Sequence, residues 1–440
     1  MKRYVWNLLA TIVDRNFKKE YAEASQVAVQ ESLTKLLFHA VNNVPYYQRV
    51  LRNTGVEKNG LLSLDNFVNI PILTKQIIRQ RARELTSIDF QGRKWFYNHS
   101  GGSTGKPVQL IQDRLFLKWI DATWTLYFKD IIGIDENFEK KIILWGALGD
   151  IFGNPRELLA RTVDNFLRNK VWLSAYRLNE YTMRKFVRII NSYKPAIIEG
   201  YAGSLYELAR FIEEKKLYIH CPKIVVSQAE QLLPPAKEKI ESIFGSEVYN
   251  FYGSREVDGM AGECKCGYLH MFTSNNYIEV LDRKDQPVRE GEEGRIVVTT
   301  LHNFSMPLIR YDIGDMAILG PEKCKCGKPF PTLIRITGRQ VEHFIKEDGE
   351  LISGYYFYLI FMQETWIKAF SLIQEDYARI RIKIELSDSV PNQIRERMID
   401  EKIERLMGKT CEIVWEVTDE IPKTRTGKYL FIQSKLKHPA

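Results

Sequence analysis

The fold class is decided by a short stretch that reads Ala196-Ile197-Ile198-Glu199-Gly200-Tyr201-Ala202-Gly203-Ser204-Leu205. An apolar run passes through a turn of small residues into an amphipathic helix over 205–212. A second apolar run at 224–226 precedes a helix over 236–244, and a third at 142–145 precedes a helix over 183–190. Such alternation predicts an α/β fold, a mostly parallel sheet with helices on its faces.

The segments on either side of this core have different patterns. Apolar residues recur at helical spacing from Leu33 to Val44, and this pattern ends at Pro45. Residues 1–90 as a whole predict helices that cover a larger part of the molecule. After the core, residues 277–281 and 295–299 read as strands joined through a glycine- and glutamate-rich turn. A smaller, β-rich subdomain is therefore expected there.

The C-terminal part reads as a separate α+β domain. Ile380, Ile382 and Ile384 alternate with charged residues, which predicts a strand with one wet face. A helix over about 392–406 and a strand over 412–417 follow. We therefore expect an N-terminal domain over 1–338 (helical cover 1–90, α/β core 91–260, β-rich part 261–338) and a C-terminal domain over 339–440.

Composition and charge exclude several classes of protein. The 440 residues carry 63 basic and 55 acidic side chains, a mild excess of +8 with no basic cluster of interleaved aromatics, so no nucleic-acid partner is expected. No apolar run approaches the roughly 20 residues of a membrane span. Asp14, Arg15 and Lys18 interrupt the apolar start too early for a signal peptide, so we expect a cytoplasmic protein.

The most informative stretch for chemistry is Ser100-Gly101-Gly102-Ser103-Thr104-Gly105-Lys106-Pro107. Its glycines allow a tight turn whose backbone N–H groups can approach an anion. The hydroxyls of Ser100, Ser103 and Thr104 add donors, and Lys106 adds a point charge. These features predict a phosphate-binding loop, although the residue order is not that of the P-loop.

This loop resembles the Ser/Thr/Gly-rich loop of the adenylate-forming superfamily, which contains acyl-CoA synthetases, adenylation domains and luciferases. Its form is most similar to the branch of phenylacetate–CoA ligases and related capsule-biosynthesis proteins. Further motifs follow in the family's order, so that the resemblance covers residues ~30 to 435. It implies ATP and Mg²⁺ as cofactors and a mobile C-terminal lid, with Gly102 and Gly105 among the phosphate-binding residues.

The remaining motifs imply the other site residues. The segment Asn250-Phe251-Tyr252-Gly253-Ser254-Arg255-Glu256 resembles the family's Tyr-Gly-x-Thr-Glu, in which the aromatic residue stacks on adenine and the glutamate holds Mg²⁺. Asp315 ends a segment whose aspartate accepts both ribose hydroxyls in the family. Arg339 corresponds to the arginine that contacts the nucleotide. Lys428, in a C-terminal Pro-x-x-x-x-Gly-Lys loop, corresponds to the lysine that neutralises charge during adenylation.

Two further segments resemble the same branch. The turn at 200–205 lies between a predicted strand and a predicted helix, where ligands gather in parallel sheets, and Ser227-Gln228-Ala229-Glu230 follows the next strand. The resemblance implies that Ala229 and Glu230 line the adenine and acyl site, while an ordinary strand-to-helix connection is the competing interpretation.

Four of the six cysteines form two Cys-Lys-Cys-Gly turns, at 264–267 and 324–327. Thiolates and imidazole in such a cluster predict a tetrahedral Zn²⁺ site, with Cys264, Cys266, His270, Cys324 and Cys326 as candidates. The resemblance favours Cys264, His270, Cys324 and Cys326, and a set of four thiolates that includes Cys266 is the alternative. We interpret the zinc as structural because a closed site leaves no position for substrate.

The resemblance implies an ATP-dependent ligase that activates a small carboxylic acid as acyl-AMP and transfers the acyl group to CoA. An amide ligase that transfers it to an amine, in surface-polysaccharide or secondary-metabolite biosynthesis, is the alternative. A third possibility is a nucleotide-binding protein without catalysis, against which Lys428 and Glu256 argue. The identity of the acid stays open, and these expectations allow a homodimer.

Overall fold

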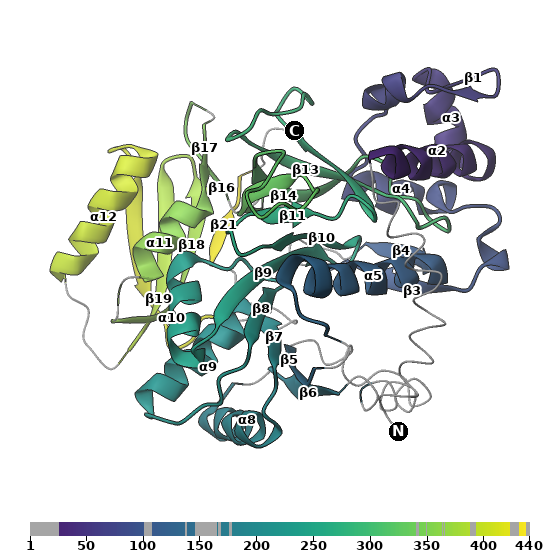
Figure 1. The fold of residues 1–440 in the computed structure, drawn as a ribbon. Coiled ribbons are helices and arrows are strands. Elements are labelled where there is room, and N and C mark those ends of the chain that lie inside the picture. Colours follow the sequence, from purple (N-terminus) through teal and green to yellow (C-terminus); the bar gives the residue numbers. More distant parts are fainter. Residues whose placement is uncertain are drawn as a thin grey trace, which may run out of the picture.

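The computed structural model describes residues 26–100, 108–136, 139–145, 165, 169–175, 178–339, 343–348, 350–362, 364, 366–387, 393–422 and 431–436. One sheet of 11 strands, in the order β12-β13-β14-β15-β11-β10-β9-β8-β7-β5-β6, runs through the molecule. Small sheets pair β1 with β2, β3 with β4 and β16 with β17, and β20, β19, β18 and β21 form a four-stranded sheet. Figure 1 shows the large sheet between its helices, with the four-stranded sheet to one side.

The parallel half of the large sheet is the predicted α/β core. It contains β5 (Lys141–Trp145), β6 (Lys170–Ser174), β7 (Ile197–Tyr201), β8 (Ile224–Gln228) and β9 (Glu247–Ser254). These strands pair in parallel, β6 to β5, β5 to β7, β7 to β8 and β8 to β9. The alternation of apolar runs and helices in the sequence therefore predicted this half correctly.

Helices cover both faces of the parallel strands. Successive residues of a strand point to opposite faces, and both faces are apolar here because the strands carry apolar residues at successive positions. On one face, Ile198 and Val225 pack with α8 (Glu180–Tyr193), α9 (Ala202–Glu214) and α10 (Pro234–Phe244). On the other face, Ile197 and Val226 pack with the end of α5 (Arg114–Leu126) and the helical turn η3 (Tyr127–Ile132).

The antiparallel half continues the same sheet. It contains β10 (Asp258–Glu263), β11 (Leu269–Met271), β12 (Asn276–Leu281), β13 (Glu293–Thr300), β14 (Tyr311–Leu319) and β15 (Thr332–Arg339). The β9–β10 hairpin joins it to the parallel half. The β-rich region therefore extends the core sheet. After β9 the chain reverses direction in a hairpin, and β10 pairs with β9 in the antiparallel sense.

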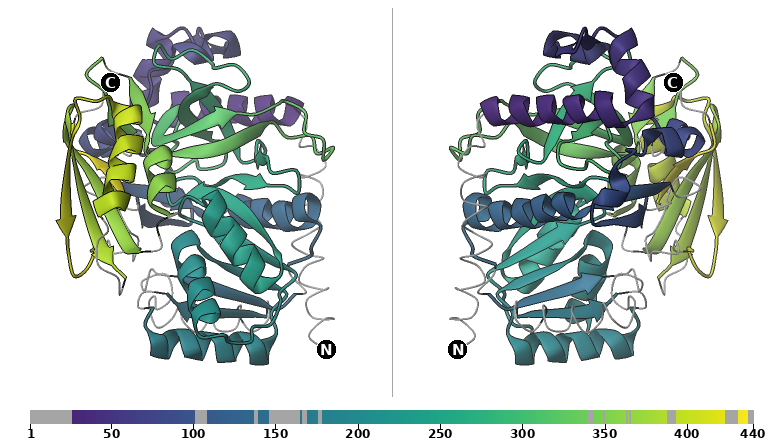
Figure 2. Two further views of the ribbon diagram at one scale, coloured as in Figure 1. Left: turned by 90° about the vertical axis from the view of Figure 1, so that its left-hand side faces the viewer. Right: turned by 90° about the vertical axis from the view of Figure 1, so that its right-hand side faces the viewer.

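The helical cover lies over the antiparallel half, as Figure 2 shows for the long helix α2. It consists of α2 (Gln26–Asn43), α3 (Pro45–Asn53), β1 (Glu57–Lys58), β2 (Leu61–Leu62), η1 (Leu64–Asn69), α4 (Lys75–Leu85) and η2 (Phe90–Gly92). Pro45 ends the first helix as predicted, and it also begins the next one at a position where its missing N–H costs nothing. The β3 (Trp95–His99) and β4 (Gln109–Asp113) hairpin follows the cover.

The C-terminal region has its own sheet and core. Its elements are β16 (His343–Ile345), β17 (Leu351–Ser353), α11 (Gly354–Met362), β18 (Ile367–Asp376), β19 (Arg379–Leu386), α12 (Gln393–Met407), β20 (Glu412–Val417) and β21 (Ile432–Ser434). Ile380, Ile382 and Ile384 are fully buried, as the alternating pattern predicts. Among the described residues, no helix is both long enough and apolar enough to span a bilayer.

Candidate active site and metal site

The end of β9 carries the residues predicted to meet the nucleotide. The Tyr252 hydroxyl donates a 2.7 Å hydrogen bond to Oδ2 of Asp315, which lies on β14 and is 8% exposed. The backbone of Asp315 lies opposite that of Arg339 in the antiparallel pairing of β14 with β15. Two predicted nucleotide-binding segments, far apart in sequence, therefore meet through a direct contact, and the backbone of a third lies on the adjacent strand.

Phe251 occupies a different environment from Tyr252. Adjacent strand residues point to opposite faces, and the Phe251 ring stacks on Trp124 at 3.7 Å between centroids, with Tyr127 and Phe272 beside it. Phe251 is 4% exposed. The Phe251 ring therefore belongs to the hydrophobic core under α5, and a part for this residue in nucleotide binding stays a prediction.

Glu256, the predicted Mg²⁺ ligand, lies in the turn between β9 and β10 and is 5% exposed. The Ser254 hydroxyl oxygen accepts bonds from the backbone N–H groups of Glu256 (3.2 Å) and Val257 (3.3 Å). Gly253 is required by the hairpin, because a Cβ there would lie 2.7 Å from the carbonyl oxygen of Asp258. Ser254 and Gly253 thus shape the turn that positions the Glu256 carboxylate.

The hairpin that carries the glycine-rich loop also holds this turn. Gln112 on β4 donates from Nε2 to the carbonyl oxygens of Arg255 (3.2 Å) and Glu256 (3.1 Å), and Asn98 on β3 donates to the Arg255 carbonyl at 2.9 Å. The Asn98 amide also donates to Gln112 Oε1 at 2.9 Å. The base of the predicted phosphate loop and the predicted magnesium ligand are therefore one hydrogen-bonded unit.

Ser100 closes the base of that loop. Its N–H donates to the Val108 carbonyl at 2.9 Å, and its hydroxyl oxygen accepts the Val108 N–H at 2.8 Å. Other predicted residues lie outside the described ranges: Gly102, Ser103, Thr104, Gly105, Lys106 and Lys428. The described part of the loop is thus its base, which is anchored beside Glu256 through the same hairpin.

The predicted segment at 227–230 lies at the carboxyl end of β8, beside the carboxyl end of β7. The Glu230 carboxylate accepts a 2.8 Å bond from the Gly203 N–H at the start of α9. Ala229 has a φ of 64°, a left-handed conformation that costs energy for a residue with a side chain. Asn250, in register with Ser227, donates its backbone N–H to Glu263 at 2.8 Å. The segment at 227–230 therefore adjoins β9. That Ala229 and Glu230 line the adenine and acyl site stays a prediction.

Electrostatics around the turn are governed by burial. Desolvation raises the pKa of Asp258 to about 6, even though its carboxylate accepts the Gly259 N–H at 2.7 Å. Deeper in the sheet, Lys141 is buried and forms ion pairs with Glu136 and Glu199, and the Gln228 amide donates to Glu199 at 2.9 Å. Burial there is matched by paired charges, which is the arrangement that low-dielectric surroundings require.

The cysteine turns come together in the antiparallel half. Single ligand atoms of Cys264, His270, Cys324 and Cys326 all lie within 4.8 Å of one another. The Cys264 and Cys324 sulfurs are 3.8 Å apart, the edge of a tetrahedron with Zn–S bonds of about 2.3 Å. His270 directs Nε2 to Cys326 Sγ at 3.0 Å and Nδ1 to the Phe330 carbonyl at 3.2 Å, an outer contact that orients metal-binding histidines.

Cys266 does not join this group. Its side chain is exposed, whereas its N–H donates to Cys264 Sγ at 3.4 Å. The Cys326 N–H makes the equivalent bond to Cys324 Sγ at 3.5 Å. The second cysteines of the two turns therefore differ: Cys326 lies in the cluster, whereas Cys266 lies outside it. The alternative set of four thiolates, which needs Cys266, is not brought together. Burial raises the pKa of the Cys264 thiol to about 12, and a bound dication is what would offset that cost.

Comparisons with known proteins agree with this geometry. Residues 344–435 match the family described as CapK C-terminal domain. Protein CapK of Staphylococcus aureus is 22% identical over 399 residues, 90% of this chain and 86% of that protein. A phenylacetate-coenzyme A ligase of Thermus thermophilus is 23% identical over 437 residues, 91% of this chain and 94% of that protein. The chain is therefore similar over most of its length to CapK and to phenylacetate-coenzyme A ligases.

The fold of this chain is also that of a solved acid–CoA ligase. The structure of 2-hydroxyisobutyryl-CoA ligase in the postadenylation state, in complex with 2-HIB-AMP, superimposes with a TM-score of 0.71 at 19% identity. The match covers 92% of this chain and 88% of that chain. The predicted resemblance to the adenylate-forming fold is therefore confirmed.

Sequence reasoning missed several residues that contact the turn at Glu256. Asn98 and Gln112 contact the 255–256 turn from far away in the chain, and neither belongs to a recognisable motif. Lys75 places Nζ 3.5 Å from Glu256 Oε1. The only local signal for Lys75 was its place after Thr74, a good helix N-cap, which predicts a helix start and no contact with the site.

Proposed function

We propose that this chain is an ATP-dependent acid ligase, which forms an acyl-AMP and transfers the acyl group to CoA. The observation that carries the proposal is the contact between Tyr252 and Asp315, with Glu256 held in the turn that follows the same strand. Similarity to CapK and to phenylacetate-coenzyme A ligases over nine-tenths of the chain supports it. An aromatic face, a ribose acceptor and a metal carboxylate are what Mg·ATP requires.

Each residue has a distinct role in the first step. The substrate carboxylate attacks the α-phosphorus of ATP, the bond to the β-phosphate oxygen breaks, and pyrophosphate leaves with the electron pair. Asp315 and Tyr252 would hold the ribose and the base, while Glu256 would hold Mg²⁺, whose charge offsets that of the phosphates. Lys428 and the loop at 100–107 would stabilise the developing charge, which is the main barrier in such reactions.

We propose that the division into 1–338 and 339–440 serves the two steps. A lid that carries Lys428 would turn away after adenylation and let the acceptor reach the acyl-AMP. The 2-hydroxyisobutyryl-CoA ligase has been solved both in a postadenylation state and, with CoA, in a thioesterification state. Lys428→Ala should therefore suppress pyrophosphate exchange far more than transfer from preformed acyl-AMP, with Lys409→Ala as an exposed control on the same domain. Equal losses in both steps would contradict this role.

We also propose a structural Zn²⁺ on Cys264, His270, Cys324 and Cys326. These four groups fit the ion in donor type and in spacing, and the set leaves no open position for substrate. The metal would join the β10–β11 turn to the loop before β15. Reduced thiols in such a cluster also suit a cytoplasmic location.

The decisive experiment is ATP–pyrophosphate exchange over a panel of small aliphatic and aromatic acids, with Mg²⁺ present. Exchange that depends on one acid would support the ligase, and its absence with every acid would favour a nucleotide-binding protein without catalysis. Adding CoA or simple amines to the active pair then identifies the acceptor, because only the true acceptor releases AMP stoichiometrically with an acyl product.

An amine acceptor is the second candidate. The proposed lid, whose residues 344–435 match the CapK C-terminal domain, would contribute to the binding of either acceptor in the second step. If amines rather than CoA release AMP, the chain is an amide-forming ligase, with a role in surface-polysaccharide assembly as the proposal to pursue.

A further inference from the structure

The helical cover is bonded directly to the strand that carries Asp315. The Leu73 N–H donates to the Arg310 carbonyl at 2.8 Å, and the Asp312 N–H donates to the Leu73 carbonyl at 2.9 Å, so the cover adds a short bridge beside the start of β14. This start of β14 lies just ahead of Asp315 in sequence. The segment before α4 is therefore held against the nucleotide-binding region by backbone bonds.

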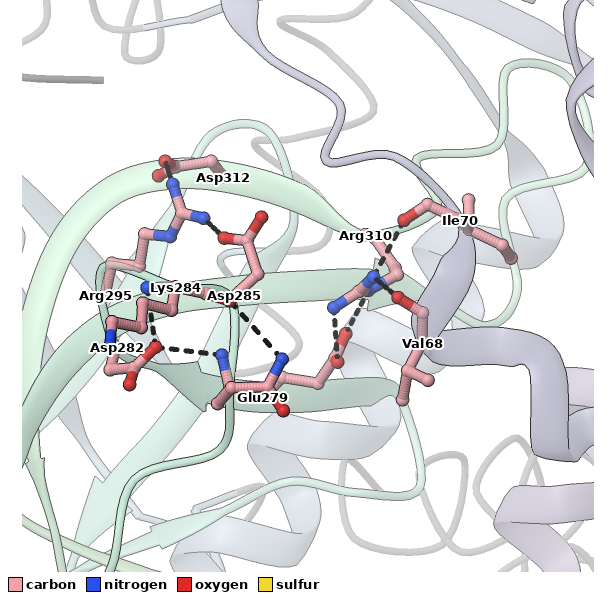
Figure 3. Close-up of polar contacts among 10 residues, drawn as sticks. Val68, Ile70, Glu279, Asp282, Lys284, Asp285, Arg295, Arg310 and Asp312 are labelled. Atoms are coloured by element: carbon pink, nitrogen blue, oxygen red, sulfur yellow. Dashed lines mark hydrogen bonds and ion pairs between the residues drawn. The ribbon is translucent and has the colours of Figure 1, made fainter. Parts of the chain in front are cut away.

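A buried arginine reinforces the same junction. Arg310 is 2% exposed and forms a bidentate ion pair with Glu279, both contacts at 3.1 Å (Figure 3). Its remaining N–H groups donate to the carbonyl oxygens of Val68 and Ile70, the latter at 2.7 Å. We call this set the Arg310 clamp. It fixes the path of residues 68–73 and so determines where α4 begins.

This junction places Lys75 next to Glu256. Lys75 is the first residue of α4, and the Thr74 hydroxyl caps the helix by accepting the Ile77 N–H at 3.3 Å. Lys75 Nζ lies 3.5 Å from Glu256 Oε1, and the side chains are 22% and 6% exposed. A cation from the cover therefore rests against the carboxylate to which the proposed function assigns Mg²⁺.

We propose that Lys75 binds the β- and γ-phosphates of ATP, and the pyrophosphate product, while it pairs with Glu256 when no nucleotide is present. This inference rests on the proposed function. Mg²⁺ in nucleotide sites is held by one or two carboxylates together with phosphate oxygens. A group 3.5 Å from that carboxylate consequently reaches the phosphates, and lysine binds phosphate as a point charge. The positive charge of Lys75 stabilises the negative charge on departing pyrophosphate.

The test compares ligands that contain and lack the outer phosphates. Lys75→Met removes the charge but keeps most of the side chain, Lys75→Arg keeps the charge, and Lys58→Met removes an exposed lysine from β1 of the same cover. Calorimetric binding of Mg·ATP, Mg·pyrophosphate and AMP is measured for each purified full-length variant. Matched melting temperatures and far-UV circular dichroism establish that each variant is folded.

Lys75→Met should weaken Mg·ATP and Mg·pyrophosphate on the order of 10- to 100-fold, whereas AMP should bind within about twofold of the wild type. Lys75→Arg should recover much of the loss, and Lys58→Met should match the wild type. Equal weakening of AMP and pyrophosphate, or no change in either, would overturn the proposal and leave Lys75 as a structural partner of Glu256. If Lys75→Met does not fold, the same selectivity read from Lys75→Gln decides.

The outcomes separate this inference from the proposed function. If the wild type neither binds ATP nor exchanges pyrophosphate with any acid, the ligase proposal fails and the role of Lys75 fails with it. If the wild type does both while Lys75→Met is unchanged, only the role of Lys75 is wrong.

Discussion

At the residue scale, the proposed nucleotide site depends on one contact between side chains. The Tyr252 hydroxyl donates to Asp315 at 2.7 Å across 63 positions of sequence. The bond orients a carboxylate that is largely shielded from water. The sequence showed both residues in recognisable motifs, whereas their mutual contact required the fold.

Asp315→Asn tests the ribose role. The amide keeps the shape of the side chain but loses the negative charge and one acceptor, so the dissociation constant for AMP should rise on the order of 10- to 100-fold. Isothermal titration measures it directly. Tyr252→Phe, which keeps the ring and the carboxylate, should cost less, and an Asp315→Asn protein with wild-type AMP affinity would rule out a ribose contact.

His302 predicts a specific dependence of stability on pH. The residue is 7% exposed, its ring stacks on Trp119 at 3.7 Å, and burial lowers its pKa to about 4 from an ordinary value of 6.5. Between these values the unfolded chain binds the proton and the folded chain does not, so stability falls as the pH falls. From about pH 7.5 to about pH 5, His302 should remove about 2 kcal/mol from the free energy of unfolding.

Urea unfolding of the wild type and of His302→Gln at the two pH values measures this contribution. The other buried titratable groups are common to both proteins, so their contributions cancel in the comparison. The variant should lose less stability than the wild type on acidification, and parallel pH profiles would show that His302 titrates normally in the folded state.

At the scale of elements, two short turns build the proposed zinc site. In each Cys-Lys-Cys-Gly turn, the first sulfur accepts the N–H of the second cysteine, and the first carbonyl accepts the glycine N–H. Gly267 and Gly327 have φ values of 82° and 78°, which residues with a side chain rarely adopt. The repeated sequence therefore encodes a repeated turn, but the partner of each turn is chosen by the strands that carry it.

The two turns provide a matched pair of cysteine variants. Cys324→Ser removes a buried ligand, whereas Cys266→Ser changes an exposed thiol in the companion turn. We expect about one zinc per chain in the wild type and in Cys266→Ser, and little in Cys324→Ser, whose melting temperature should fall by roughly 5 °C or more. Elemental analysis and calorimetry provide the readout. Zinc loss from Cys266→Ser alone would reverse the assignment.

At the scale of the whole molecule, the Arg310 clamp joins the cover to the antiparallel half of the sheet. Arg310 adopts a φ of 49°, and its N–H donates to the Thr299 hydroxyl at 2.9 Å. Burial raises the pKa of Glu279, which the guanidinium opposes. The buried charges of Arg310 and Glu279 thus each have a hydrogen-bonded partner, without which their burial would be costly.

Arg310→Met should therefore lower the free energy of unfolding by about 3–5 kcal/mol, because it leaves the Glu279 carboxylate buried without its partner. Chemical denaturation gives the value. Adding Glu279→Gln to the same chain should return part of the loss, since a neutral amide is cheaper to bury. A loss below about 1 kcal/mol for the single variant would mean that the pair behaves like a surface ion pair.

The class of fold and most of the elements could be predicted from the sequence, because the local spacing of apolar residues shows which face of a helix or strand is buried. The sequence also identified the motifs, since each is a continuous run. Only the tertiary structure decided that β9 turns Tyr252 toward Asp315 and Phe251 into the core, that Cys266 stays outside its cluster, and that the β-rich region continues the central sheet. The contacts of Lys75 and Gln112 with the turn at Glu256 were likewise set by the tertiary structure. Their roles arise from contacts between distant segments, and local spacing holds no information about which segments will meet.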